Sequence, residues 1–399
     1  IGRGEGCGAW EDDATLPRWR SSSWCNLNHE TEVPPRKGRD FCVAATENGA
    51  PGKAEGFVGE RTSSAASEPR RIGRGEGCGA WEDDAVPVPR IPQGSPLPFS
   101  FPGESAIIPA KAKRTPPRRE ERSKTMKIID AHLHIFAPDE EWAQEAARSV
   151  GHENTIEHLR LAYGELGMVH GVVMGNRSLE VGRHDYPADL FHYCVGLDRM
   201  ILHGGKSIPE DLAGQVEEHL KRDNCCGVKL YPGYNRIWLT DPIYAPIYDL
   251  AARYDKPVAV HMGQTAGSRA KLKYSHPLAL DEAAADHPKT RFVMCHFGNP
   301  FLEDAAAVVE KNHNVALDLS GFLEGRVDLD RYFTVHRKYA DLLITWLTYL
   351  QSWDRVMYGT DWPIVNLGEY IRYIQRLVPE EQWEQVFFDN ANRIYGLGL

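Results

Sequence analysis

Two histidines, His132 and His134, are separated by a single residue at the end of an apolar segment, and this spacing suits a metal site. Because side chains alternate faces along a strand, the two rings would point the same way and lie about 7 Å apart. A single histidine at a strand end is more often a buried residue with satisfied hydrogen bonds than a ligand. Two imidazoles side by side without a metal are costly to bury, so the pair favours a metal site.

Three more polar residues follow apolar segments that have the pattern of strands. His261 and His296 each end such a segment, and Asp361 comes just after the last one. Imidazole nitrogen and carboxylate oxygen are the ligands expected for zinc, and also for iron, manganese or nickel. If the strands close into a barrel, their C-terminal ends meet at one mouth, where barrel active sites lie. We therefore expect these residues and the histidine pair to become neighbours.

The elements that would position these residues are short apolar runs separated by helical patterns. Most intervals between the runs are roughly 30 residues, the length of one strand-plus-helix unit. Eight such strands predict an α/β protein with a (β/α)₈ TIM barrel, and a doubly wound open sheet is the alternative. The predicted strands are Lys127–His132, Met168–Met174, Phe191–Gly196, Gly227–Tyr231, Pro257–His261, Arg291–His296, Asn314–Leu319 and Arg355–Tyr358.

Helical patterns fill the intervals between the predicted strands. The segment Asp211–Arg222 places apolar residues on one face at helical spacing. The segment Pro246–Tyr254 follows an Asp-Pro pair, and Asp241 is the expected cap of this helix.

Residues 1–125 differ in composition from the rest of the chain. They hold more than half of its 26 Pro and lack sustained apolar periodicity, so we expect a disordered extension. Residues 1–14 recur letter for letter at 72–85, which is typical of a recent duplication and not of a stacked repeat. Because Met126 directly precedes the first strand, we expect 1–125 to be an upstream translation or gene-model artefact and 126–399 to be the enzyme. A targeting segment is the alternative, although its many acidic residues are unlike a transit peptide.

The bulk properties narrow the choice of partners. The formal net charge is -10, which argues against nucleic acid because phosphate binding needs clustered Lys and Arg. No run of about 18 apolar residues occurs, so we expect no membrane span. The 8 Cys show no zinc-finger spacing and no secretory context, which favours reduced thiols in the cytoplasm. We expect a small-molecule substrate and leave open a homo-oligomer.

The ordered set of motifs resembles the amidohydrolase superfamily, and most closely its amidohydrolase-related (amidohydrolase 2) branch, which includes metal-dependent decarboxylases. The motifs are the H-x-H of His132 and His134, the strand-end His261 and His296, and G-T-D-W-P around Asp361. The resemblance covers residues 126–399. It implies that both histidines of the pair, His261 and Asp361 hold a divalent metal, zinc above all, as one or two ions. It also implies that Asp361 accepts a proton from the activated water, and that His296 is a second-metal ligand or a polarising acid/base group.

Four further residues are candidates for the site, either because of the same resemblance or because of their position in the loops. Lys229, near the end of the fourth strand, is carboxylated and bridges two metal ions in part of the superfamily. In other members this position binds substrate as a cation, and a structural ion pair is a third possibility. Tyr234 and Arg236, just beyond that strand, and Trp362, next to Asp361, could shape the substrate pocket. Ordinary loop residues are the alternative for each of these three.

The chemistry implied is that of a metal-dependent hydrolase, in which activated water attacks an amide, lactone or ester carbonyl of a small organic substrate. The alternative enzyme is a metal-dependent decarboxylase of aromatic or unsaturated carboxylic acids, in which His296 and Asp361 protonate the carbon that loses CO₂. Lys229 favours hydrolysis, because a second metal is less useful for decarboxylation. A third interpretation is a non-catalytic barrel. The presence of five polar residues at the strand ends argues against it.

Overall fold

The computed structural model describes residues 126–206 and 208–399, so the prediction of disorder for residues 1–125 lies outside the described residues. Eight parallel strands pair in sequential order. Each predicted strand overlaps an observed one. The observed strands are β1 (Ile128–Leu133), β2 (Met168–Met174), β3 (Phe191–Leu197), β4 (Cys225–Leu230), β5 (Val258–His261), β6 (Phe292–Cys295), β7 (Val315–Asp318) and β8 (Val356–Met357).

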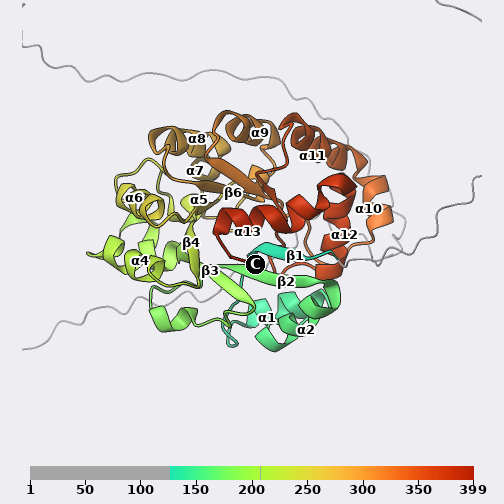
Figure 1. Ribbon diagram of the computed structural model, residues 1–399, viewed down its shortest axis with the longest axis horizontal. Coiled ribbons are helices and arrows are strands. Elements are labelled where there is room, and N and C mark those ends of the chain that lie inside the picture. The colour runs from blue at the N-terminus through green and yellow to red at the C-terminus, as the bar shows by residue number, and fades with distance from the viewer. Residues whose placement is uncertain (1–125, 207) are drawn as a thin grey trace, which may run out of the picture. The chain divides into compact units, whose positions relative to one another are not determined.

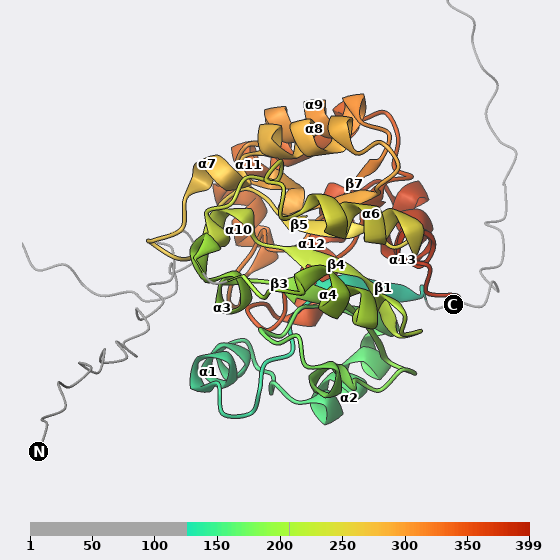
Figure 2. The same cartoon turned by 90° about the vertical axis from the view of Figure 1, so that its left-hand side faces the viewer.

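Helices connect successive strands and lie around the outside of the sheet (Figure 1, Figure 2). The α-helices are α1 (Glu141–Ser149), α2 (Ile156–Leu166), α3 (Arg199–Leu202), α4 (Leu212–Leu220), α5 (Pro232–Asn235), α6 (Ala245–Arg253), α7 (Leu272–Ser275), α8 (Pro277–Asp286), α9 (Leu302–Lys311), α10 (Leu329–Val335), α11 (Arg337–Tyr349), α12 (Leu367–Leu377) and α13 (Asn390–Tyr395). Shorter turns of helix are η1 (Val181–His184), η2 (His203–Gly205), η3 (His296–Gly298), η4 (Glu380–Gln382) and the π-helical η5 (Gln385–Asp389). None of the helices in the described ranges is long and apolar enough to cross a membrane.

The sheet closes on itself between its first and last strands. The Ala131 amide donates to the Tyr358 carbonyl at 3.0 Å, and the Thr360 amide donates to the His132 carbonyl at 3.1 Å. These bonds join β1 to the segment that continues from β8. The predicted (β/α)₈ barrel is therefore confirmed, and the open-sheet alternative is wrong.

The two predicted helices are present, and one detail of their capping differs. The helix expected at Asp211–Arg222 is α4, and its apolar residues are buried as predicted. The helix expected at Pro246–Tyr254 is α6, but its N-cap is Tyr244 and not Asp241. The Asp241 side chain accepts from the Ile243 amide instead, because a short turn separates it from the helix.

The apolar core has two layers, one between the strands and the helices and one inside the barrel. Helix α13 lies across the barrel in Figure 1 and packs against β1 and β8. Lys127, just before β1, lies over the Phe388 ring that precedes α13, so this helix covers the end where the strands begin. Polar residues lie at the opposite end, where the strands finish. The inner layer contains Ile129, Ala131, Val172, Met174, Cys194, Cys226, Ala259, Val293, Cys295, Ala316, Met357, Ala391, Ile394, Tyr395 and Leu397.

A bulge near the end of β1 aims the histidine pair into the barrel. Asp130 pairs with Gly171 and Leu133 with Val173, so β1 advances three residues while β2 advances two. Ala131 belongs to the inner layer of the core, whereas Leu133, which strict alternation would place beside it, belongs to the outer layer. The extra residue therefore reverses the alternation, and His132 follows Ala131 onto the inner side.

Candidate metal centre

The structure gathers the five polar residues from the strand ends at one end of the barrel. His132 lies in β1, His134 follows it, His261 ends β5, His296 follows β6, and Asp361 follows β8. The backbones of His296 and Asp361 are left-handed, with φ of 61° and 63°. This conformation is uncommon for residues other than glycine, and such strain clusters at functional sites.

Asp361 joins the histidine pair in one compact set of donors. Its Oδ1 atom lies 3.3 Å from His134 Nε2 and 3.5 Å from His132 Nε2. One ligand atom from each residue lies within 4.8 Å of the others, as a shared metal ion requires. The centroids of the two rings are 5.4 Å apart, somewhat closer than expected for a regular strand.

His261 and His296 face each other through ring nitrogens that both lack a hydrogen. His261 Nε2 lies 2.9 Å from the Gln264 carbonyl, which only accepts, so this nitrogen donates and Nδ1 is bare. His296 Nδ1 lies 3.3 Å from the Ser320 carbonyl, so it is the protonated nitrogen and Nε2 is bare. The two bare nitrogens are 3.1 Å apart, and their lone pairs repel unless a cation or a proton lies between them.

Two properties of these residues fit a divalent cation. One ring nitrogen has no hydrogen-bond partner among the described residues, and the rings and the carboxylate have the charge states that metal ligation requires. His132 Nε2 is buried and has no hydrogen-bond partner within the described ranges. Burial lowers the pKa of His132 and of His296 to about 4 and that of His261 well below its ordinary value, so these rings are neutral, as metal ligation needs. Burial alone would raise the pKa of Asp361, but its hydrogen bond to His134 and the neighbouring rings hold it well below its usual range.

Asp318 at the end of β7 was missed by the sequence analysis. It is fully buried, its Oδ2 lies 2.9 Å from His132 Nδ1, and its Oδ1 accepts from the His296 amide at 3.0 Å. Together with the two histidines it is also spaced closely enough to hold a metal. The signal was present, because the predicted strand Asn314–Leu319 contains this one charged residue among apolar neighbours.

A second buried carboxylate, Asp130, fixes the backbone of the site. It accepts from the His132 amide at 3.2 Å and from the Thr360 amide and hydroxyl at 2.9 and 2.7 Å. Burial raises the pKa of Asp130 to about 7, although these hydrogen bonds act in the opposite direction. Asp130 therefore ties the end of β1 to the loop that carries Asp361.

Lys229 lies inside the barrel, fully buried. Its Nζ is 2.8 Å from Cys295 Sγ and 5.2 Å from the centroid of the Tyr231 ring. Within residues 126–206 and 208–399 no carboxylate lies within ion-pair distance of Nζ, although the charge of Lys229 helps to lower the pKa of Asp318. Carboxylation and substrate binding by Lys229 stay predictions.

The predicted substrate residues lie in different environments. The Tyr234 ring is half-buried, 5.1 Å from the His261 ring. Arg236 is exposed, and its guanidinium donates to the Arg269 carbonyl at 2.8 Å, so it is committed to the loop. Trp362 has no exposed surface, and its ring packs against the rings of His152 and His158. Direct contact between Trp362 and a substrate would require this side chain to move.

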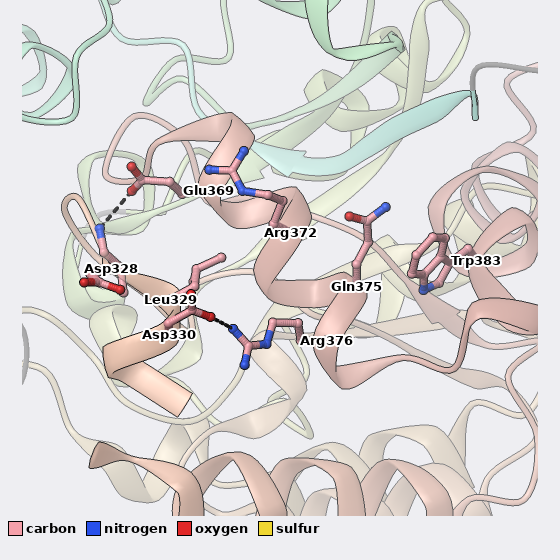
Figure 3. A pocket seen from close by; sticks show the side chains of 9 residues that line it. Asp328, Leu329, Asp330, Glu369, Arg372, Gln375, Arg376 and Trp383 are labelled. Carbon is pink, nitrogen blue, oxygen red and sulfur yellow. Dashed lines mark hydrogen bonds and ion pairs between the residues drawn. The ribbon is translucent and has the colours of Figure 1, made fainter. Parts of the chain in front are cut away.

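A surface cleft of about 530 Å³ lies between α10 and α12, and none of the candidate site residues lines it (Figure 3). Two contacts join residues that line it: Arg376 donates to Asp330 at 2.9 Å, and the Val327 amide donates to Glu369 at 2.8 Å. The cleft is therefore separate from the metal centre.

Comparisons with known proteins agree with the barrel fold. The family model described as Amidohydrolase matches residues 129–397. No curated protein matches the sequence. An uncharacterized TIM-barrel protein from Bordetella bronchiseptica is 20% identical with a TM-score of 0.51, over 68% of this chain and 99% of that one. An amidohydrolase from Burkholderia multivorans is 16% identical with a TM-score of 0.50, over 68% and 99%. A 2,6-dihydroxybenzoate decarboxylase in complex with 2,6-dihydroxybenzoate is 16% identical with a TM-score of 0.50, over 69% and 100%. At these identities the solved structures bear on the fold alone.

Proposed function

The chain belongs to the amidohydrolase family, and from that premise we propose that it is a metal-dependent hydrolase of small carbonyl compounds. The observation that carries the proposal is the meeting of His132, His134 and Asp361, whose donor atoms lie within 4.8 Å of one another. Neutral rings and an ionised carboxylate are the forms that ligate a divalent ion. The enzyme would act in the cytoplasm on a small molecule, as a monomer or a homo-oligomer.

These three residues and His261 would hold the ion, which we take to be zinc. With two ions, His296 and a carboxylated Lys229 would complete the set. A bound divalent ion supplies Lewis acidity that polarises the carbonyl of the substrate.

The protein's own groups would move the protons. The pKa of Asp361 is held low, so the group is ionised at neutral pH and can accept a proton from the attacking water. Its carboxylate is also one-fifth exposed, and substrate can reach it. His296 presents a bare Nε2 to the same space and can take up a proton there or share in holding an ion.

Aromatic rings beside the metal centre favour a planar substrate. The Phe136 ring stacks on His134 with centroids 5.6 Å apart, and Tyr231 stacks on His261 at 6.3 Å. Such faces suit an aromatic ring or a conjugated lactone. They also support the second candidate, decarboxylation of an aromatic acid, the type of compound named for one of the structurally similar enzymes.

The test is a paired assay on the full chain supplied with Zn²⁺. Acid release from aryl esters, amides and lactones is followed beside CO₂ release from hydroxylated aromatic acids, with Asp361→Asn as the matched variant. The proposal predicts acid release without CO₂, reduced by about 100-fold or more in the variant. Release of CO₂ without any hydrolysis would overturn it in favour of the decarboxylase.

A further inference from the structure

Asp318 makes hydrogen bonds beside two histidines of the metal centre, His132 and His296. It ends β7, is fully buried, and uses both carboxylate oxygens. Oδ2 faces His132 Nδ1 at 2.9 Å, and Oδ1 accepts from the amides of His296 and Ser320 at 3.0 and 3.2 Å. The Ser320 hydroxyl donates to the same Oδ1 atom. Oδ1 therefore accepts from three donors, which is the pattern of an ionised carboxylate.

The contact with Oδ2 decides which nitrogen of His132 carries the hydrogen. A carboxylate oxygen can only accept, so Nδ1 of the neutral ring is the donor. Nε2 is then bare, and this is the buried nitrogen without a partner that lies 3.5 Å from Asp361 Oδ1.

The contact with Oδ1 acts on His296 through Ser320. The serine hydroxyl has one hydrogen and gives it to Asp318, so its oxygen accepts from His296 Nδ1 at 2.8 Å. His296 therefore also has its hydrogen on Nδ1 and a bare Nε2, which faces His261 at 3.1 Å.

We propose that Asp318, with Ser320, is a positioning residue that fixes the tautomers of His132 and His296, so that both rings present a bare Nε2 to the metal. The proposal rests on the metal centre of the proposed function. Partners of this kind orient metal-bound histidines and raise their basicity. The alternative is that Asp318 is itself a ligand, which its spacing to the two rings allows. Against that, its Oδ2 atom is already engaged with His132 Nδ1.

The substitution Asp318→Asn separates these roles. Three donors meet Oδ1, so the amide oxygen of the asparagine would take that position. The amide NH₂ would then face His132 Nδ1, which must become an acceptor. The ring would carry its hydrogen on Nε2, at the place where the ion would bind.

The matched control is Asp130→Asn, the same change at a buried carboxylate of the same site. Asp130 contacts amides and hydroxyls but no ring nitrogen, so its replacement should leave the tautomers unchanged.

The experiment is ¹⁵N NMR of histidine-labelled full chain without metal, followed by Zn²⁺ titration against a competing chelator. Wild type should show His132 and His296 with hydrogen on Nδ1. Asp318→Asn should move the His132 hydrogen to Nε2 and weaken Zn²⁺ binding by about 10- to 100-fold at unchanged stoichiometry. The Asp130→Asn spectrum should keep the wild-type tautomers.

The proposal is overturned if wild type has either ring with hydrogen on Nε2, or if folded Asp318→Asn keeps both its tautomer and its affinity. A loss of one ion from two in Asp318→Asn would identify a ligand and also overturn it. If the variant does not fold, the wild-type spectrum alone decides. That spectrum needs no metal, so a wild-type chain that binds no Zn²⁺ would defeat the proposed function while the tautomers are still read.

Discussion

Gly321 lies in the loop after β7, against the metal centre. The methyl group added by Gly321→Ala should press on two residues of that centre. A Cβ at this position would stand 2.9 Å from His296 Nδ1 and 3.3 Å from Asp361 Oδ2. Ordinary van der Waals contact begins at 3.4 Å, so the ring must retreat or the loop must shift. His296 Nδ1 is also the atom that bonds to Ser320, so the methyl group strains that hydrogen bond as well. We expect Zn²⁺ affinity to fall by about 10- to 100-fold, as for other changes around metal ligands.

Gly325→Ala is the matched control for this substitution. Gly325 has a φ of 78°, close to the 70° of Gly321, but a Cβ there would meet nothing within 4 Å. Both changes should therefore cost about 1–2 kcal/mol of unfolding free energy from left-handed strain. Urea unfolding measures that shared cost, and chelator competition measures Zn²⁺ affinity. Equal affinities in the two variants would show that a methyl group at position 321 does not disturb the metal centre.

Three further predictions concern the ligands, pH and packing. His132→Asn should remove metal and activity together, weakening Zn²⁺ binding by more than about 100-fold; activity that survives unaltered would show that the ligand assignment is wrong. In the metal-free chain the folded pKa values of His132 and His296 are about 4 against 6.5 in the unfolded chain, so the unfolded chain binds more protons between these values. The unfolding free energy should therefore fall as pH drops from 6.5 to 4, and urea titrations that show a rise would contradict this. Trp362→Ala should cost about 3–5 kcal/mol of unfolding free energy because the ring is fully buried, and a loss below about 1 kcal/mol would contradict the packing.

The fold could be predicted from the sequence because barrel strands are buried on both faces and form continuous apolar runs. The regular spacing of these runs placed His261, His296 and Asp361 at strand ends before any contact was known. Parallel strands in a closed barrel then leave only one end for all of them.

The contacts within the site could not be predicted in the same way. The bulge that turns His132 inward depends on the pairing of β1 with β2, which no local pattern specifies. The hydrogen bond between His132 and Asp318 joins residues 186 positions apart. Trp362 illustrates the same limit, since its place beside Asp361 in sequence suggested a pocket wall whereas packing buries it completely.

Asp318 could have been found with the rule that identified the other residues. A charged side chain in an apolar strand is rare unless it is paired, and Asp318 sits in the run Val315–Asp318. The other polar residues come at the last position of a predicted strand or just after it, whereas Asp318 is the last residue but one of the predicted strand Asn314–Leu319.

If residues from four separate strands build a metal site, the purified protein should contain bound metal. The full chain is purified under zinc-replete conditions, dialysed and analysed for bound metal beside His132→Asn. We expect about one or two ions per wild-type chain and a clear loss in the variant. Less than about 0.2 ions per wild-type chain, with the barrel folded, would contradict it.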